Sequence, residues 1–565
     1  MRNRFFIPGI LFLTVALSLP ALIIAQQSRS ARRGPAPDRS AVTGSAGAKA
    51  TATGPAIRSD LSEALSVIQA NHIDGKKLDY NSIFKSSISG MLSVLDPHST
   101  YLDPIEYASF RTEQRSEYFG IGATIEDLRE GKDVNTFIRA TFNDSPAARA
   151  GLRFGDRIAA VDGQSMKGKT YPEVRKFLLG PRGTTVKVTV VHPGNNQTET
   201  VNIVRDAVSL PSIAQAYMLQ PGVGYVAMTG GFNQTTADEF DDALKFLHGK
   251  GMNMLVLDLR GNRGGLLIQA VRVANTFLQR GQMIVSQKGR FRDSSQEYKA
   301  INDSPDNVPL VVLVNGETAS AAEIVAGALQ DHDRALIIGE TTFGKGLVQF
   351  PFQLDYDSAL LLTIAHYFTP SGRLIQRDYS NGAYSYYLPG GLAGEKTQAA
   401  PQNGPESHTD TGRAVYGGGG ISPDETVKPG TISAAERHVR DVIFAFSLEL
   451  VTGRVTGFES YKVQRAIEFD HDLANDDYPV TDALFNQLKK FAAAKQEFHT
   501  TSEQLDKSRT FAERQLRYNI LSAAYGYRVA TQVFNDGDPQ VERAVAAMPK
   551  ARELAQAATR ARARG

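Results

Sequence analysis

Cysteine is absent from all 565 residues of the chain. The protein therefore has no thiol nucleophile, no disulfide, no cysteine-ligated metal and no sulfur for lipid attachment. An excess of charge of either sign is missing too, since 62 basic residues stand against 60 acidic ones. Electrostatics thus gives no reason to expect nucleic-acid binding. The ten histidines are scattered and no HExxH pattern occurs, so we expect neither a metal nor an organic cofactor.

The composition is otherwise ordinary, with 42% apolar and 22% charged residues, as in globular proteins. The length predicts about three or four domains. We expect an α/β multidomain protein, in which strands and helices alternate through the central part. The expected segments are a helical region (57–117), a β-rich domain (118–208), an α/β core with an irregular insertion at about 377–417 (209–430) and a helical region (431–565).

The N-terminus predicts export. Arg2 and Arg4 precede the almost wholly apolar stretch 5–25, which is typical of a signal peptide. The same stretch has roughly the 20 apolar residues that span a bilayer, so an uncleaved membrane anchor stays open. Residues 26–56 are rich in Ala, Gly, Ser, Thr and Pro and predict a disordered tether. Either outcome puts the bulk of the protein outside the cytoplasm.

Helical spacing of apolar residues between 57 and 95 ends in the sequence LDPHSTYLDP. Its two Asp-Pro pairs favour turns. His98 lies within this segment, and we expect it to be structural or exposed and not catalytic.

Residues 118–208 resemble a PDZ domain, and the SPAARAGLRFGDRIAAVDG stretch at 145–163 carries most of the resemblance. The resemblance implies that backbone N–H groups receive a free carboxylate and that the following strand pairs with an extended peptide. The helix with Val174 and Leu178 would flank this groove. The residues expected to form the carboxylate loop are Phe119, Gly120, Ile121 and Gly122.

The stretch 308–349 carries the strongest chemical signal. Val311–Val314 is a short apolar run typical of a strand buried on both faces, and Ser320 then opens a helical stretch. A second predicted strand, Ala335–Ile338, leads into a glycine-flanked loop that contains Lys345. A serine at a helix start and a lysine in the next loop form a candidate catalytic pair.

Two simpler interpretations compete with this pair. Ser320 and Glu323 match a capping box, in which each side chain binds the backbone of the other residue. The Gly339–Lys345 stretch matches a phosphate-binding G-x-x-x-x-G-K loop. However, Gly346 replaces the magnesium-binding Ser or Thr, and the LVQFPFQL run that follows predicts a strand instead of the required helix. We therefore set the nucleotide hypothesis aside.

The catalytic interpretation requires Lys345 to be neutral, because only an uncharged amine can accept the proton of Ser320. Burial between glycines favours that form. Gln349 lies four residues further along a predicted strand, hence on the same face, where its amide could orient the lysine. A histidine alternative would use His332 or His366 with Asp331 or Asp333, yet no GxSxG turn surrounds Ser320.

Four motifs in this order, DLRGNRGG, VNGETASAAEI, GETTFGKGLVQ and TPSGRLIQ, resemble the C-terminal processing peptidases, also called tail-specific proteases. The resemblance covers roughly residues 60–430. It implies a ClpP- or crotonase-like core, with Ser320 as nucleophile, Lys345 as base and Gln349 in support. The oxyanion hole would combine the backbone N–H of Ala321 with that of a glycine in the Gly264–Gly265 pair, between which the sequence does not choose.

We therefore expect an exported serine endopeptidase of the bacterial cell envelope, which binds proteins with a free C-terminus and needs no cofactor. The chain departs from the family at Arg263, where proline or serine is common, and in the 377–417 insertion. The rival hypothesis is a noncatalytic PDZ scaffold. An activating adaptor protein, membrane attachment through the N-terminal segment and homo-oligomers formed through the helical C-terminal region stay open.

Overall fold

The computed structural model describes residues 53–380, 386–387, 404–464 and 467–563. The described residues divide into two compact units, one that ends at Leu95 and the other that begins at Asp96. The predicted export segment and most of the predicted tether lie outside the described residues. None of the helices in the described part of the chain is both long and apolar enough to cross a lipid bilayer.

The smaller unit consists of two helices, α1 (Gly54–Asn71) and α2 (Tyr80–Leu92), joined by a short 3₁₀ turn, η1 (Gly75–Lys77). Asp79 caps α2, since its carboxylate accepts a hydrogen bond of 3.0 Å from the Asn81 N–H. No residue of α1 is buried. The helical spacing predicted for this stretch is therefore confirmed, but α1 builds no core in this unit.

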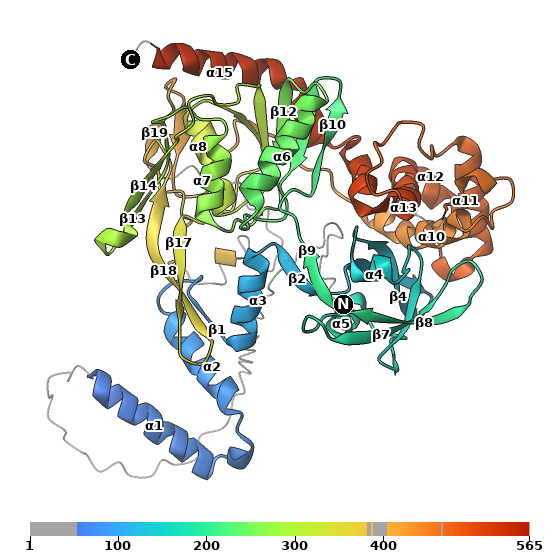
Figure 1. Ribbon diagram of the computed structural model, residues 1–565, viewed down its shortest axis with the longest axis horizontal. Coiled ribbons are helices and arrows are strands. Elements are labelled where there is room, and N and C mark those ends of the chain that lie inside the picture. The colour runs from blue at the N-terminus through green and yellow to red at the C-terminus, as the bar shows by residue number, and fades with distance from the viewer. Residues whose placement is uncertain (1–52, 381–385, 388–403, 465–466, 564–565) are drawn as a thin grey trace, which may run out of the picture. The chain divides into compact units, whose positions relative to one another are not determined.

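The larger unit contains a six-stranded sheet, here called the central sheet, of which β10 and β12 are labelled in Figure 1. Its order is β10-β11-β12-β15-β16-β21, and all neighbouring pairs except β10–β11 are parallel. The predicted buried strands are confirmed as β15 and β16. The strands span Gln215–Gln220 (β10), Val223–Ala227 (β11), Met254–Asp258 (β12), Leu310–Val314 (β15), Leu336–Gly339 (β16) and Glu425–Thr426 (β21).

Both faces of this sheet are buried, which explains the continuous apolar strands. In β15, Leu310, Val312 and Val314 pack into one hydrophobic cluster, while Val311 and Leu313 pack into another. The helices α6 (Thr236–Gly249), α7 (Leu267–Asn275) and α8 (Ala321–Asp331) contribute to the first cluster. The second is covered by α14 (Pro539–Ala546) and α15 (Met548–Arg562), from the red end of the chain in Figure 1.

A second, antiparallel sheet brings distant segments together. It contains β1 (Thr100–Leu102), β13 (Met283–Gly289), β14 (Gln296–Lys299), β17 (Leu347–Gln353) and β18 (Ala359–Phe368). β18 lies at its centre and pairs with β1, β13 and β17. Because β1 and β17 both pair with β18, the LDPHS segment that precedes β1 lies near β17, the strand that contains Gln349.

The predicted PDZ segment forms a sheet of its own, β3-β4-β5-β7-β8, to which β6 (Gln164–Ser165) adds. β3 (Ala123–Glu130) is an edge strand and lies next to α5 (Tyr171–Leu178). A ribbon of β2 (Glu117–Gly120) and β9 (Asp206–Ser209) flanks the domain in the sequence. The remaining elements are β4 (Asp133–Thr141), α4 (Pro146–Arg149), β5 (Arg157–Val161), β7 (Thr185–Val191) and β8 (Thr198–Val204).

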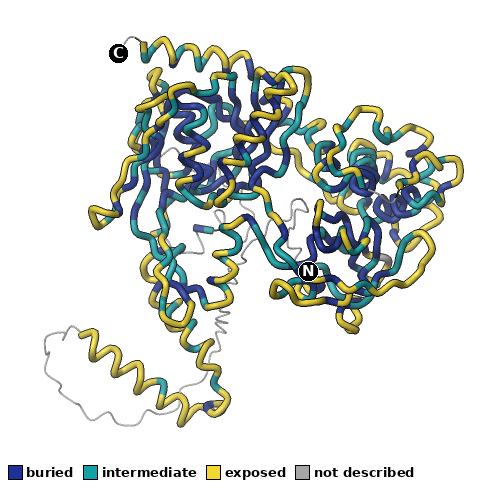
Figure 2. Tube along the Cα trace, in the orientation of Figure 1, coloured by how far each residue is buried: buried dark blue, intermediate teal, exposed yellow. Residues whose placement is uncertain are grey.

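The helices after residue 431 separate into two groups. The first shares one hydrophobic core with the PDZ segment, which contributes Leu128, Phe137 and Phe154. Figure 2 draws the buried parts of the chain in dark blue. Arg139 joins the two through a hydrogen bond of 2.7 Å from Nη2 to Asn519 Oδ1. This group comprises α10 (Ala434–Val451), α11 (Asp482–Ala494), α12 (Ser502–Lys507) and α13 (Arg509–Ala530). The second group, α14 and α15, packs on the central sheet.

Candidate active site

Ser320 lies between β15 and α8, where the chain turns from strand into helix. Its φ of 57° is positive, an unusual and strained conformation for a residue with a side chain. Three hydrogen bonds hold it: the Ser320 N–H donates to Glu323 Oε2 at 2.7 Å, and its carbonyl accepts from the Tyr367 hydroxyl and from the Ile324 N–H, both at 3.0 Å. Strain of this kind is maintained at functional turns, where the surrounding structure fixes it.

Glu323 does more than the predicted capping contact. Its side chain is fully buried, and Oε2 also accepts from the Lys345 N–H at 2.9 Å. Oε1 accepts from the Thr342 hydroxyl at 2.5 Å and from the Gly344 N–H at 2.7 Å. Burial raises the pKa of Glu323 and these hydrogen bonds oppose the rise. Because all four neighbours donate, they require the carboxylate form, and one oxygen holds the backbones of Ser320 and Lys345 side by side.

Lys345 follows β16 and precedes β17, with Gly344 in a left-handed conformation before it (φ 87°). Its Nζ donates to Gln349 Oε1 at 2.7 Å, so the structure brings together the predicted lysine and glutamine. Burial of the amine lowers the pKa of Lys345 to about 8, although the negative charges of Asp96 and Glu323 act in the opposite direction. A large fraction of the amine is therefore neutral near pH 8 and able to accept a proton.

Gln349 is anchored in turn by the LDPHS segment. Its Nε2 donates to the backbone carbonyl of His98 at 2.7 Å, while Asp96 Oδ1 accepts from the His98 N–H at 2.8 Å. Burial lowers the pKa of His98 to about 3, and the Lys345 charge adds to this effect, so the ring is neutral. Its Nε2 is within 2.7 Å of the Tyr386 hydroxyl. We expected His98 to be structural; the unexpected feature is that its carbonyl reaches the candidate catalytic groups.

Of the two glycines of the DLRGNRGG loop, Gly264 lies directly against Ser320 and Gly265 lies against Phe232. A Cβ added to Gly264 (φ 92°) would be 2.7 Å from the Ser320 Cβ, and one added to Gly265 (φ 145°) would be 2.2 Å from the Phe232 carbonyl oxygen. The Gly264 N–H donates to Asn262 Oδ1 at 2.9 Å. Among the described residues, nothing accepts from the N–H groups of Gly265 or Ala321, which leaves both free for an oxyanion.

The structure does not join the candidate nucleophile and base directly. No hydrogen bond connects the Ser320 hydroxyl and the Lys345 amine in the described part of the chain. The histidine alternative is not assembled either, since His332 uses one ring nitrogen on Asp410 (2.9 Å) and the other on the Met283 carbonyl (2.7 Å). Its expected partner Asp331 is paired with Arg373 at 2.5 Å.

The predicted peptide groove can be located on the PDZ segment. β3 is an edge strand, as pairing with a peptide requires. Gly122 (φ 76°) tolerates no side chain, because an added Cβ would be 2.3 Å from the Ser145 Cβ. Val174 and Leu178 are buried, at 0% and 4% exposure, in the domain's own core. They are thus packed inside the domain, and contact between these two side chains and a ligand stays a prediction.

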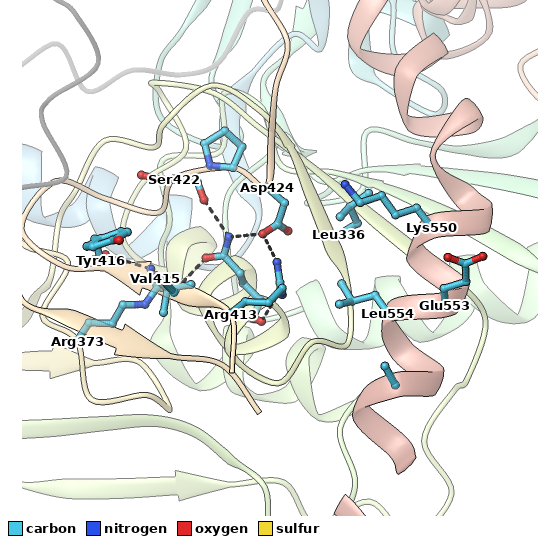
Figure 3. Close-up of a pocket in the computed structure, with 14 residues that line it drawn as sticks. Leu336, Arg373, Arg413, Val415, Tyr416, Ser422, Asp424, Lys550, Glu553 and Leu554 are labelled. Carbon is cyan, nitrogen blue, oxygen red and sulfur yellow. Dashed lines mark hydrogen bonds and ion pairs between the residues drawn. The ribbon is translucent and has the colours of Figure 1, made fainter. Parts of the chain in front are cut away.

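A cavity of about 600 Å³ lies elsewhere, against α15 (Figure 3). Arg373, Arg413 and Asp424 line it together with Lys550 and Leu554. None of the predicted site residues does. Three of its charged groups are already in ion pairs, Arg413 with Asp424, Arg373 with Asp331 and Lys550 with Glu425, so the chemistry is better sought at Ser320.

Comparisons with known proteins agree with this location. A model described as peptidase family S41 matches residues 222–381, and a PDZ-domain model matches 143–191. The carboxy-terminal-processing protease of Bartonella bacilliformis is 39% identical over 303 residues, which are 53% of this chain and 68% of that protein. The carboxy-terminal processing protease CtpA of Bacillus subtilis is 35% identical over 333 residues, which are 59% of this chain and 69% of that protein.

Among solved structures, a photosystem II D1 C-terminal processing protease is 33% identical, with 55% of this chain and 88% of that chain covered and a TM-score of 0.32. The segment that matches the peptidase model includes Ser320, Lys345 and Gln349. Since more than a third of the aligned residues are identical over two thirds of both bacterial relatives, this chain belongs to peptidase family S41 and is a PDZ-containing serine protease of the carboxy-terminal processing type.

Proposed function

We propose that this protein is an exported endopeptidase that uses Ser320 as nucleophile and Lys345 as general base. The observation that carries the proposal is the Glu323 carboxylate, one oxygen of which holds the backbones of both residues at 2.7 and 2.9 Å. The lysine beside it has a pKa lowered to about 8 by burial, which suits a base working near neutral pH.

In the first step, the neutral Lys345 amine takes the proton of the Ser320 hydroxyl while the oxygen attacks the peptide carbonyl. The amine donates a hydrogen bond to Gln349, and we expect the contact to serine to form in the complex with substrate, as catalytic hydrogen bonds often do. The negative charge that develops on the carbonyl oxygen would be bound by the N–H groups of Ala321 and Gly265. We choose Gly265 because the Gly264 N–H is already engaged.

In the second half of the cycle, the protonated lysine gives its proton to the leaving amine, and the acyl group stays on Ser320. Water, deprotonated by the same lysine, then hydrolyses this ester and restores the enzyme. Gln349, whose Nε2 donates to the His98 carbonyl, would hold the Lys345 amine in position toward Ser320 without adding a charge. The chemistry needs no cofactor.

A trapped acyl-enzyme tests this mechanism. With a peptide p-nitrophenyl ester, acylation is fast, and acid quenching during turnover should leave the acyl group on Ser320, where peptide mapping by mass spectrometry detects it. Ser320→Ala should carry no label and cleave nothing. An acyl group on another residue would contradict the assignment. A protein that binds tail peptides but neither acylates nor cleaves would support the rival scaffold hypothesis.

We further propose that the PDZ domain reads the free C-terminus of a substrate protein. A substrate tail would pair with the β3 edge, and its carboxylate would enter the loop of Phe119, Gly120, Ile121 and Gly122. The core would be of the ClpP/crotonase class, a proposal supported by the parallel strands and intervening helices. The apolar segment 5–25 supports export to the bacterial envelope. An adaptor and self-association through the C-terminal helices remain compatible with this scheme.

Amidation of a substrate's C-terminal carboxylate is expected to raise KM about tenfold, because one charge-assisted set of hydrogen bonds is lost. Steady-state kinetics on matched peptides with free and amidated ends measures the effect. An isolated short peptide that spans only the scissile bond serves as the control and should respond little. Equal KM values for the free and amidated forms of the long substrate would contradict tail recognition.

A further inference from the structure

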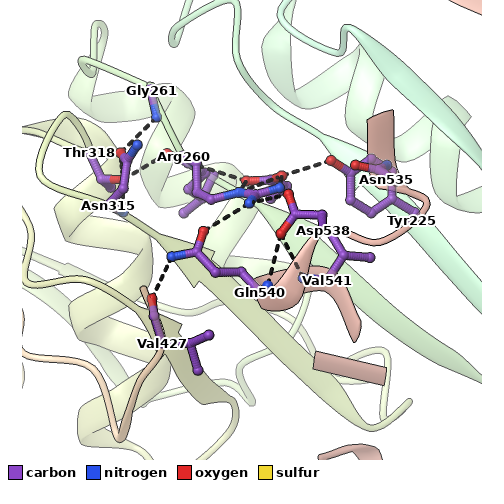
Figure 4. Close-up of polar contacts among 12 residues, drawn as sticks. Tyr225, Arg260, Gly261, Asn315, Thr318, Val427, Asn535, Asp538, Gln540 and Val541 are labelled. Atoms are coloured by element: carbon purple, nitrogen blue, oxygen red, sulfur yellow. Dashed lines mark hydrogen bonds and ion pairs between the residues drawn. The ribbon is translucent and has the colours of Figure 1, made fainter. Parts of the chain in front are cut away.

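Arg260, at the start of the glycine loop, is held by residues from a distant part of the chain. Its Nη1 donates to Asp538 Oδ2 at 2.7 Å and to Gln540 Oε1 at 2.8 Å, partners almost 280 residues away (Figure 4). Its Nε and Nη2 grip Asp258, at 3.0 and 2.6 Å. The guanidinium is thus fixed between the end of β12 and the start of α14, and its side chain is 17% exposed.

The far end of this contact is rigid. Asp538 caps α14, with Oδ1 accepting from the N–H groups of Gln540 at 2.8 Å and Val541 at 3.2 Å. Gln540 is fully buried and donates to the Val427 carbonyl at 2.7 Å. α14 itself is packed on the sheet through Val541 and Ala544. Because these contacts remove apolar surface from water, α14 is a firm support.

The near end leads directly to the oxyanion glycines. The residue after Arg260, Gly261, donates its N–H to Asn315 Oδ1 at 2.9 Å, and Asn262 Oδ1 in turn holds the Gly264 N–H at 2.9 Å. Gly265 follows and is bridged to Phe232. The loop is therefore held by hydrogen bonds along the residues between the guanidinium and the N–H that would bind the oxyanion, and we expect a shift at Arg260 to reach Gly265.

We propose that Asp538 and Gln540 are positioning residues for catalysis, which hold the oxyanion loop in place through Arg260. The inference rests on the proposed roles of Ser320 and Gly265. Misplacement of an oxyanion donor affects the transition state more than substrate binding. Loss of the Asp538 contact should therefore lower kcat, leave KM nearly unchanged and weaken the binding of a transition-state analogue. General destabilisation of α14 would also lower the apparent kcat, by reducing the folded fraction, but it would leave the affinity of the analogue unchanged.

Asp538→Asn tests the proposal, because asparagine still caps a helix but removes the charge that pairs with Arg260. We expect kcat to fall about tenfold with KM within about twofold, and the Ki of a peptide aldehyde, whose hemiacetal with Ser320 places an oxyanion at the loop, to rise by a similar factor. Gln540→Met, which loses only the hydrogen bonds of a buried amide, should show a smaller change in the same direction. It also serves if Asp538→Asn does not fold.

Arg543→Gln is the matched control. It removes an ion pair of 2.6 Å between α14 and Glu425 of β21 without touching Arg260, and kcat should stay unchanged. If Asp538→Asn and Gln540→Met both keep the kcat and the aldehyde Ki of the parent enzyme, the proposed positioning role is wrong. It is also wrong if Arg543→Gln loses as much kcat as Asp538→Asn. In either case Ser320→Ala would still abolish cleavage. If Ser320→Ala cleaves normally, the proposed function itself fails, and the two failures are thereby distinguished.

Discussion

A Lys345→Met variant is expected to have a kcat about 10⁴-fold below that of the parent enzyme at pH 8, measured with a peptide or unfolded-protein substrate. Methionine has similar length and flexibility and suits an apolar site, so the fold should persist while the base is lost. The buried amine carries the proton transfer in both halves of the proposed cycle. Far-ultraviolet circular dichroism and thermal unfolding would check that the variant is folded.

The pH dependence supplies the control for this prediction. Below about pH 8 the Lys345 amine is protonated and cannot act as a base, so kcat/KM should rise with pH and level off above that value. Gln349→Glu would place a carboxylate where the amide oxygen now lies 2.7 Å from Nζ. Opposite charge favours the ammonium, so the midpoint should move upward and activity at neutral pH should fall. A profile that is flat from about pH 6 to 9 would contradict lysine as the base.

A Glu323→Gln variant is expected to have a kcat about 10²–10³-fold lower than the parent enzyme. Its free energy of unfolding should be lower by about 1–3 kcal/mol. The present carboxylate accepts from four donors, those of Ser320, Thr342, Gly344 and Lys345. In glutamine an NH2 group replaces one of the two carboxylate oxygens, and this donor would face the donors of the neighbouring residues. The Ser320 turn and the Lys345 loop should then separate, and steady-state kinetics with thermal unfolding would measure both effects.

Two further measurements separate geometry from charge at Glu323. Its negative charge raises the pKa of Lys345, so its removal should move the midpoint of the pH profile downward even as the plateau falls. Thr342→Val removes only one of the four donors and keeps the carboxylate, and should cost less than about tenfold in kcat. If Glu323→Gln keeps both plateau and midpoint, the carboxylate does not organise the site.

Local patterns were enough to predict the parts of the site that lie on regular elements. The apolar runs at 311–314 and 335–338 predicted β15 and β16, and the helix start after Ser320 predicted α8. Strand periodicity placed Gln349 beside Lys345, although a bulge between Val348 and Gln349 interrupts the register of β17. The two side chains are nevertheless hydrogen-bonded, as the sequence predicted.

The contacts that link remote segments could not be predicted in this way. Gln349 binds the backbone carbonyl of His98, and a carbonyl has no signature in the sequence because every residue carries one. Arg260 binds Asp538 across almost 280 residues, so no spacing rule applies. For the same reason we expected one helical region after residue 431, whereas α14 and α15 pack on the central sheet.

The position of α14 and α15 in the chain has a consequence for biosynthesis. The sheet is complete in sequence by Thr426, but the side chains that cover its second face, from Val541 to Ala551, are made more than a hundred residues later. A nascent chain therefore carries an uncovered apolar surface until those helices emerge. The same delay postpones the proposed support of the oxyanion loop, so cleavage by the nascent chain should be slower until α14 has been made.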